Sequence, residues 1–443
     1  MAVVTTFIVL IALYVYALAV VSPWGETDRD SDEGSHEPFF VLLVPALNEE
    51  RVIGRTIASL LELRGRFLAI VVDDGSDDGT VATVAPFLAD PRLRLLEQPP
   101  EQARRGKGHA LNAAYAAIQR LGITGTAPPR TSTGWSSASR ARRGFLSAYR
   151  YDPENVITVV FDADTRVEPD FLQAVAPYFR DAAVAGVRSA VRMYNADRNL
   201  LTLWQHLEFA IWGKFFCRTK DRLGSATLGG NGQCVRFSAL SDLGSEPWHA
   251  FSLTEDLDLS LRLLKKGWRI RFCSSVAVFQ EAVPRLRALV RQRSRWLQGH
   301  VVCWQHLPAL LRSRLPFLAR GELLLFLLLP AVFMPVGLIS IINWLVVLLF
   351  KDWDGLNAVS LLIWYILGFG IAPLVVAAWR PLDHPSLWRS VLHAHLFVFY
   401  SFVWFMAGMV VYSHVLLGRR AWVKTARVAE DAQEEARPSL GGL

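Results

Sequence analysis

The stretch FLAIVVDDGS, residues 67–76, decides the fold class of this chain. Its first six residues are all apolar, which predicts a short strand that is buried on both faces. Two aspartates and a glycine follow at once, and a helix is expected from about Asp78. A buried strand that ends in carboxylates and leads into a helix is the repeating unit of a parallel α/β sheet. In such sheets the ligand-binding groups gather at the carboxyl ends of the strands.

Neighbouring segments repeat this unit. Residues 39–44 read as a buried strand that Pro45 ends, followed by a turn over residues 45–50 and a helix to about Leu63. Further strands are expected at residues 93–96, 156–161, 184–193 and 268–272. The sequence therefore predicts a Rossmann-like α/β domain over residues 37–282.

Two aspartates follow the fourth of these strands. Asp162 and Asp164 are two residues apart, so in an extended segment both carboxylates face the same side. A hard divalent ion bound by carboxylates and substrate phosphates suits this pair. The alternative is a polar turn at the end of a strand, and residues 73–75 could likewise be an ordinary turn with a helix cap.

Two glycine-rich segments are candidate ligand loops. Lys107 lies between Gly106 and Gly108 before an expected helix, an arrangement that suits a diphosphate because the backbone can approach it and the lysine adds charge. A flexible loop with a solvated lysine is the alternative. Residues 228–233 could bring the backbone close to a sugar, although a tight turn needs the same glycines.

Residues 254–265 form an amphipathic helix in this interpretation. Thr254 is placed to cap it, and Glu255 and Asp256 lie in its first turn. A carboxylate in a cleft can take a proton from a hydroxyl group. The alternative is the acidic start of an ordinary surface helix.

The pattern Gln292, Arg295 and Trp296 has helical spacing i, i+3 and i+4, so the three side chains share one face. A guanidinium can hold a phosphate with two hydrogen bonds, and an indole can stack on a sugar ring. The alternative for Trp296 is an aromatic residue at a membrane interface, because residues 283–318 alternate leucines and tryptophans with arginines. This pattern predicts amphipathic helices that lie in the interface with a cationic face.

The composition predicts a membrane protein. Hydrophobic residues make up 52% of the chain, the mean hydropathy is +0.26 and the net charge is +7. The charge fits anionic lipid or phosphate-bearing substrates, and nucleic acid is not expected because the basic residues cluster near apolar segments. The four cysteines show neither a CxxC spacing nor paired histidines, which indicates reduced, buried thiols and no zinc site.

Apolar runs at both ends predict membrane spans. Residues 1–24 are interpreted as a retained transmembrane anchor and not as a signal peptide, because no Lys or Arg precedes the apolar run. Residues 319–417 contain three long apolar runs, and the basic start of the tail, residues 418–443, places that tail in the cytoplasm. Pro330 and Pro335 interrupt the first run and make its early half a candidate in-plane helix. Residues 124–151 predict a mobile surface insertion.

The motifs occur in an informative order: the turn at residues 73–75, the Asp162/Asp164 pair, residues 254–256, and the pattern at residues 292–296. In this order they resemble those of the membrane-integrated, inverting family 2 glycosyltransferases, which include cellulose, chitin, hyaluronan and poly-N-acetylglucosamine synthases. The resemblance covers residues 39–427. It implies a GT-A domain with a mixed sheet in the cytoplasm, joined to transmembrane and interfacial α-helices of a multi-pass cell-membrane protein.

The resemblance also implies roles for individual residues. Asp256, beside Glu255, would be the general base, and repulsion between the two like charges would raise the pKa of Asp256. Asp164 and Asp162 would bind Mg²⁺ or Mn²⁺, and Trp296 would stack on the acceptor. The implied nucleotide-sugar contacts are Pro45, Ala46, Glu49, Asp74, Lys107, Asp162, Gln292 and Arg295. The implied gating residues of the tail are Trp422, Thr425 and Arg427.

Two enzymatic functions fit these motifs. The favoured one is a processive synthase that moves a sugar from a UDP-sugar to the non-reducing end of a β-linked polysaccharide and threads the polymer across the membrane, with accessory export proteins as candidate partners. The alternative is a non-processive enzyme that glycosylates ceramide, diacylglycerol or polyprenyl phosphate. A non-enzymatic scaffold is disfavoured by the two carboxylate clusters. The donor sugar is not readable from these residues.

Overall fold

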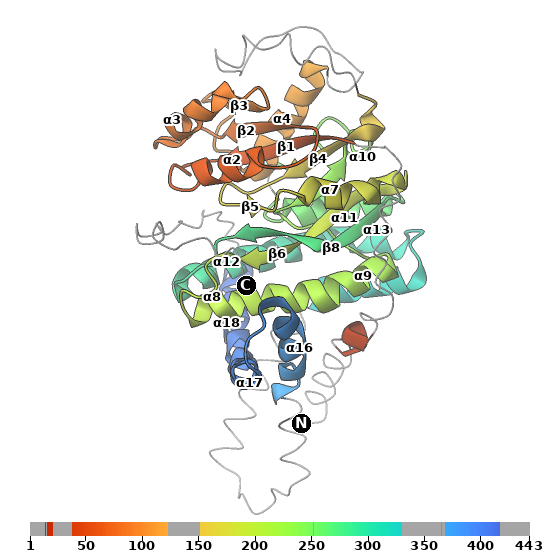
Figure 1. Ribbon diagram of the computed structural model, residues 1–443. Helices are drawn as coiled ribbons and strands as arrows, with labels where there is room; N and C mark the ends of the chain where they lie inside the picture. The colour runs from red at the N-terminus through yellow and green to blue at the C-terminus, as the bar shows by residue number, and fades with distance from the viewer. Residues whose placement is uncertain are drawn as a thin grey trace, which may run out of the picture.

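A computed structural model describes residues 14, 16–20, 38–122, 151–250, 252–329, 365 and 368–416. Its centre is an eight-stranded sheet in the order β3-β2-β1-β4-β7-β6-β8-β5 (Figure 1). The strands are β1 (Phe39–Ala46), β2 (Phe67–Asp73), β3 (Leu93–Glu97), β4 (Val156–Val160), β5 (Arg166–Val167), β6 (Val184–Met193), β7 (Gln233–Arg236) and β8 (Arg269–Gln280).

The sheet is mixed, as predicted. β3, β2, β1 and β4 are parallel to one another, whereas β7 runs antiparallel to both β4 and β6. β6 and β8 are parallel, and β5 pairs antiparallel with β8. The prediction that Pro45 ends β1 is wrong, because Pro45 pairs with Val72 and the strand continues to Ala46. The pairing of β1 with β4 stops at Leu43. Pro45, which has no backbone N–H to donate, therefore lies where β1 no longer has a partner strand on the β4 side.

Helices cover both faces of the sheet (Figure 1). In the α/β domain they are α2 (Ile53–Leu61), α3 (Thr80–Val84), η1 (Ala85–Ala89), α4 (Lys107–Leu121), η2 (Pro153–Asn155), α7 (Phe171–Val175), η3 (Ala176–Arg180), α10 (Phe237–Ser241) and α11 (Glu255–Lys265). The remaining described helices are α8 (Leu200–Ile211), η4 (Trp212–Cys217), α9 (Arg218–Leu223), α12 (Leu286–Val302), η5 (Cys303–His306), α13 (Leu307–Leu311), α16 (Ala372–Asp383), α17 (Leu387–Leu396), η7 (Phe397–Tyr400) and α18 (Ser401–Leu416). Residues 317–329 are also helical.

Strand periodicity divides the core into two layers. Successive side chains of a strand point to opposite faces, so Val41 and Leu43 pack with α4 and α11, whereas Leu42 and Val44 pack with α2 and α7. All four side chains are fully buried. Each such burial contributes about 1.5–3 kcal/mol, which explains why β1 is apolar without interruption.

A third apolar cluster joins α8 and α12 to α16, α17 and α18. Figure 1 shows these C-terminal helices on the side of α8 that faces away from β1–β3. The prediction of a continuous cationic face on α12 is wrong at Arg293. This side chain is 1% exposed and forms an ion pair with Glu208 across the cluster, so it ties α12 to α8 and does not face a membrane surface.

The described residues include one candidate membrane span. Among the described residues, one helical stretch, Leu387–Ser413, has the length and apolar composition needed to cross a membrane. Most of the anchor at residues 1–24, residues 330–364 of the predicted spans, nearly all of the insertion at 124–151 and the tail at 418–443 lie outside the described residues.

Candidate functional site

A cavity of about 1020 Å³ opens at the carboxyl ends of β1 and β4 and extends to α12, α18 and residues 317–329. The chain order reverses between β1 and β4, and such a switch point leaves a crevice for ligands in an α/β sheet. The cavity is lined by every predicted site residue in the described part of the chain: Pro45, Ala46, Glu49, Asp74, Lys107, Asp162, Asp164, Glu255, Asp256, Gln292, Arg295 and Trp296. The predicted gating residues Trp422, Thr425 and Arg427 lie outside the described residues.

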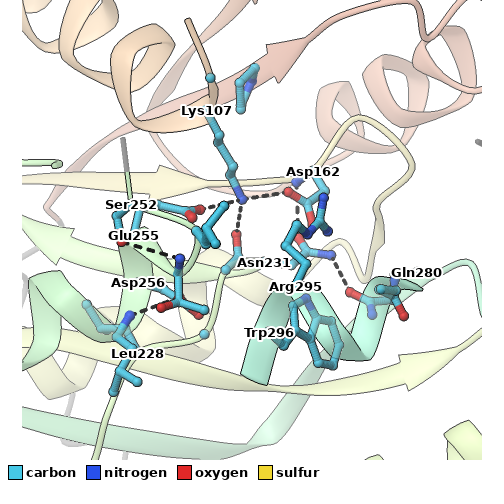
Figure 2. A pocket seen from close by; sticks show the side chains of 18 of the residues that line it. Lys107, Asp162, Leu228, Asn231, Ser252, Glu255, Asp256, Gln280, Arg295 and Trp296 are labelled. Atoms are coloured by element: carbon cyan, nitrogen blue, oxygen red, sulfur yellow. Dashed lines mark hydrogen bonds and ion pairs between the residues drawn. The ribbon is translucent and has the colours of Figure 1, made fainter. Parts of the chain in front are cut away.

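Lys107 connects the two carboxylate clusters. Its Nζ lies 2.7 Å from Asp162 Oδ1 and 3.1 Å from Glu255 Oε1, and it donates to the Gly230 carbonyl oxygen at 2.6 Å. Figure 2 shows the lysine reaching between the two acids. Burial alone would lower the pKa of Lys107, but the charges of Asp162 and Glu255 outweigh burial and raise it. Lys107 therefore stays cationic where a diphosphate would need positive charge.

The structure gives the two glycines beside Lys107 a conformational and a packing role. Gly106 has a φ of +102°, a value that favours glycine, and lies at the N-terminus of α4. A Cβ on Gly108 would lie 2.5 Å from the His249 carbonyl oxygen. The absence of a side chain at Gly108 thus lets the segment at residues 249–250 pack against α4.

Asn231 holds the turn that carries Asp162. Its Oδ1 accepts hydrogen bonds from the Asp162 backbone N–H at 3.2 Å and from the Thr165 hydroxyl at 2.8 Å, and its Nδ2 donates to Gln280 at 3.1 Å. Sequence reasoning identified the glycine-rich loop but missed this asparagine. A polar residue between two glycines was the available signal.

Asp162 and Asp164 are suitable ligands for a divalent ion. Both line the cavity, and Asp164 Oδ2 accepts the Glu281 backbone N–H at 3.2 Å, which orients that carboxylate. Within the described ranges no group of three or more His, Cys, Asp or Glu side chains could hold a metal ion. The two carboxylates fit Mg²⁺ or Mn²⁺, which bind one or two carboxylates together with phosphate and water oxygens.

Asp74 directly follows β2 and lines the cavity. It is 4% exposed, and its Oδ1 accepts hydrogen bonds from the Gln98 amide at 2.7 Å and from the Arg104 backbone N–H at 2.9 Å. Burial raises the pKa of this carboxyl, and the hydrogen bond from Arg104 opposes the shift. A fixed carboxylate in this position can accept hydrogen bonds from a nucleobase or a ribose.

Asp256 lies in the first turn of α11 and lines the cavity. The predicted cap by Thr254 is wrong, since its side chain makes no capping hydrogen bond and its hydroxyl lies 3.8 Å from Cys303 Sγ. Burial, and to a smaller extent the charge of Glu255, raises the pKa of Asp256 to about 6 despite the opposing charge of Lys107. The predicted repulsion thus contributes, but burial is the larger cause.

Helix α12 packs closely against Thr254, the residue before α11, at Gly299. A Cβ on Gly299 of α12 would lie 2.5 Å from Thr254 Cγ2 and 2.6 Å from its Oγ1. Real Cβ atoms are essentially never this close to another side chain, so α12 and the start of α11 can approach only because residue 299 is glycine. This contact sets Gln292, Arg295 and Trp296 at their distance from Asp256.

Gln292, Arg295 and Trp296 share one face of α12, as predicted, and all three line the cavity. The Arg293 guanidinium carbon lies 4.1 Å from the centroid of the Trp296 ring, and Phe209 meets that ring edge-on at 6.3 Å. Figure 2 shows Trp296 at the cavity wall beside Arg295.

Several lining residues were not singled out as site residues from the sequence. The Arg188 guanidinium, on β6, lies 3.4 Å from the position that a Cβ of Gly229 would take. Glu208 of α8 and Trp404 of α18 also line the cavity. No local motif marks these residues. They reach the cavity only because β6, α8 and α18 pack together.

A family model described as glycosyltransferase-like family 2 matches residues 37–299. The chain belongs to this family. The match extends past the predicted domain boundary at residue 282 and includes Gln292, Arg295 and Trp296 of α12. Membership of family 2, predicted from the motifs, is therefore confirmed, whereas the match does not extend to the processive polysaccharide synthases of the predicted resemblance.

Curated relatives of this chain include beta-monoglucosyldiacylglycerol synthases. The chain is 31% identical over 327 residues to the beta-monoglucosyldiacylglycerol synthase of Trichormus variabilis, covering 71% of this chain and 60% of that relative. It is 30% identical over 266 residues to the protein of the same name from Synechocystis, covering 59% and 48%. The chain thus spans no more than 60% of the length of these relatives.

The fold also matches a solved glycosyltransferase. A mannosyltransferase from Pyrobaculum calidifontis, in complex with GDP-mannose and Mn²⁺, superposes with a TM-score of 0.57 at 19% identity, covering 91% of this chain and 98% of that chain. At this level of identity the match shows the GT-A fold alone.

Proposed function

We propose that this protein transfers a sugar from a nucleoside diphosphate sugar to the hydroxyl group of a membrane lipid, with diacylglycerol as the leading acceptor and glucose as the leading sugar. The observation that carries the proposal is the single cavity that joins Asp256 and Lys107 to an apolar wall of Phe326, Leu329 and Trp404. A diphosphate needs the first part, and an acyl-bearing acceptor suits the second. The names of the relatives support this acceptor over the polysaccharide that the sequence favoured, and nothing in them supports export partners.

The reaction is a single displacement. Asp256 removes the proton from the acceptor hydroxyl, the acceptor oxygen forms a bond to the anomeric carbon, and the bond from that carbon to the diphosphate breaks. The electron pair of the broken bond leaves on the nucleoside diphosphate. Attack opposite the leaving group converts an α-linked donor into a β-glycoside, which agrees with the β-linked product in the names of the relatives.

The remaining residues bind the nucleoside and neutralise the charge of the diphosphate. Lys107 and Arg295 face the negative charge that develops on the leaving diphosphate, and Asp74 holds the nucleoside. Asp162 and Asp164 would hold Mg²⁺ or Mn²⁺, which supplies further neutralisation of the diphosphate when it is bound. Trp296 would lie against the acceptor. The catalytic domain would lie on the cytoplasmic side, where nucleotide sugars are made, and Leu387–Ser413 is the described candidate for a membrane span.

A product analysis tests this proposal. The purified protein would be supplied with diacylglycerol in mixed micelles, Mn²⁺ or Mg²⁺, and a panel of UDP- and GDP-sugars. The expected product by mass spectrometry is a lipid bearing one sugar, formed with one nucleoside diphosphate per lipid. A water-insoluble polymer made without lipid would instead support a polysaccharide synthase. If no donor led to nucleotide release, the proposed sugar transfer would be contradicted.

The base assignment predicts a pH profile. Asp256 must be ionised to accept a proton, and its pKa is about 6, so kcat/KM should fall about tenfold per pH unit below that value. The positive charge of Lys107 lowers the pKa of Asp256, so Lys107→Met should move the acid limb to higher pH in addition to lowering the rate. A profile measured from pH 5 to 8 checks both points. An acid limb that stays in place in Lys107→Met would contradict the electrostatic link.

Gly299→Ala should damage the site without touching any ligand. The added methyl group would force Thr254 and α12 apart and thereby separate Trp296 from Asp256. A displacement of about 1 Å can lower kcat by about 10²-fold. Gly321→Ala is the matched control, because a Cβ at Gly321 meets nothing within 4 Å. Equal turnover of both variants, measured with the purified proteins, would show that the helix contact does not position the site.

A further inference from the structure

One of the carboxylates that line the cavity, Glu208, has no part in the proposed transfer reaction. Glu208 of α8 lines the cavity, and its side chain is 20% exposed. Arg293 Nη2 donates to its Oε2 at 2.6 Å, the Tyr400 hydroxyl donates to the same oxygen at 2.9 Å, and Trp404 Nε1 donates to Oε1 at 2.7 Å. A carboxylate can accept about four hydrogen bonds, so one acceptor position remains.

Two tryptophan rings lie close to the Glu208–Arg293 ion pair. Trp404 donates a hydrogen bond to Glu208, and the Arg293 guanidinium carbon is 4.1 Å from the Trp296 ring centroid and 5.3 Å from that of Trp404. Trp296, Trp404 and Phe209 all line the cavity. A fixed hydrogen-bond acceptor between aromatic walls suits a ligand with both apolar C–H faces and hydroxyl groups, which describes a sugar ring.

A purely structural role accounts for only part of these observations. Arg293 is buried and needs a counter-charge, and Glu208 supplies it between α8, α12 and α18. Such a role does not require the carboxylate to be exposed in the cavity. The cavity volume of about 1020 Å³ is at the upper end of the range for ligand pockets, roughly 300–1,000 Å³, so it has room for a nucleotide sugar and a further headgroup.

We propose that Glu208 and Trp404 extend the acceptor site at Trp296 into a subsite for a neutral sugar headgroup, so that the protein also binds lipids that already carry one sugar. The inference rests on the proposed lipid glycosylation. Diacylglycerol offers one hydroxyl, which the reaction at Asp256 consumes, and therefore has no donor left for Glu208. A glycosylated lipid presents one hydroxyl to Asp256 and another to Glu208. A second transfer would be the same displacement: Asp256 takes the proton of the sugar hydroxyl, its oxygen bonds to the anomeric carbon of the donor, and the nucleoside diphosphate leaves.

Binding of a short-chain monoglucosyldiacylglycerol tests the subsite. Binding would be followed by tryptophan fluorescence in the presence of UDP, so that no turnover occurs. In Glu208→Gln the charge-assisted hydrogen bond is lost, and the dissociation constant should rise about tenfold or more. Trp388→Phe is the control, because Trp388 is 70% exposed on α17, and it should bind like the unmodified protein. An unchanged dissociation constant in Glu208→Gln overturns the subsite.

A second variant covers a failure of Glu208→Gln to fold, which could follow from an unpaired Arg293. Trp404→Phe keeps the ion pair and removes the N–H that fixes Oε1, so binding of the glycolipid should weaken about two- to tenfold. Unchanged binding in this variant also overturns the subsite.

The kinetic readout is the ratio of kcat/KM for the monoglucosyl lipid to that for diacylglycerol, which should fall in both variants. If no lipid is glycosylated but the glycolipid still binds through Glu208, the proposed function fails and the subsite stands. If diacylglycerol is glycosylated and the ratio does not change, the subsite fails and the function stands.

Discussion

Asp256→Asn should reduce sugar transfer by about 10³-fold while the affinity for the nucleoside diphosphate changes little. The amide has the shape of the carboxylate but cannot take the proton of the acceptor hydroxyl. Asp256 lies at the start of α11, where burial and Glu255 raise its pKa to about 6, a value that suits a base working near neutral pH. Rates from nucleotide release and affinities from calorimetry, measured on the same preparation, separate the two effects.

The control for this substitution is Asp242→Asn. Asp242 is half exposed and bonds to Lys266 and Trp268 outside the cavity, so its loss should leave turnover close to that of the unmodified protein. Near-normal turnover in Asp256→Asn would remove this residue from the role of base. Glu255, which already contacts Lys107 at 3.1 Å, would then be the next residue to substitute.

Asp164→Asn should lower the rate by about 10²-fold and raise the concentration of Mn²⁺ needed for half-maximal activity at least tenfold, because an amide is a weaker ligand than a carboxylate for a hard divalent ion. The substitution keeps an oxygen that can accept the Glu281 N–H, so the local turn should persist. Mn²⁺ binding in the presence of UDP, followed by electron paramagnetic resonance, gives a readout that does not depend on turnover.

Asp170→Asn is the matched control for the metal pair, because Asp170 is exposed just before α7, a few residues along the same segment. It should bind Mn²⁺ like the unmodified protein. If Asp164→Asn retains full affinity for Mn²⁺ in the presence of UDP, this carboxylate is not a ligand, and Asp162 becomes the residue to test.

The Glu208 subsite bears on the two functions that the sequence left open. A carboxylate between aromatic rings would also suit the terminal sugar of a growing chain, so the site by itself does not separate one added sugar from many. The relatives favour a lipid acceptor, and the proposed subsite extends that acceptor to a lipid with one sugar. Product size therefore tests the acceptor class, and the binding of the glycolipid to Glu208→Gln tests the subsite.

The sequence by itself determined the sheet, the family and the order of the site motifs. Uninterrupted apolar strands such as β1 and β2 are visible locally because burial on both faces requires them, and the aspartates that follow β2 and β4 must lie at one edge of a parallel sheet. The helical spacing of Gln292, Arg295 and Trp296 likewise predicted a shared face, and the cavity contains all three.

Only the tertiary structure decided how these parts meet. Lys107 bridges Asp162 and Glu255, Gly299 admits Thr254, and Glu208 binds residues of α12 and α18. Each contact joins elements that are far apart in the chain, and local periodicity carries no information about which distant element packs against a given face. The same reason explains the errors at Arg293 and Thr254: an arginine on an amphipathic helix and a threonine before a helix have common local roles, and packing against Glu208 and Gly299 replaced both.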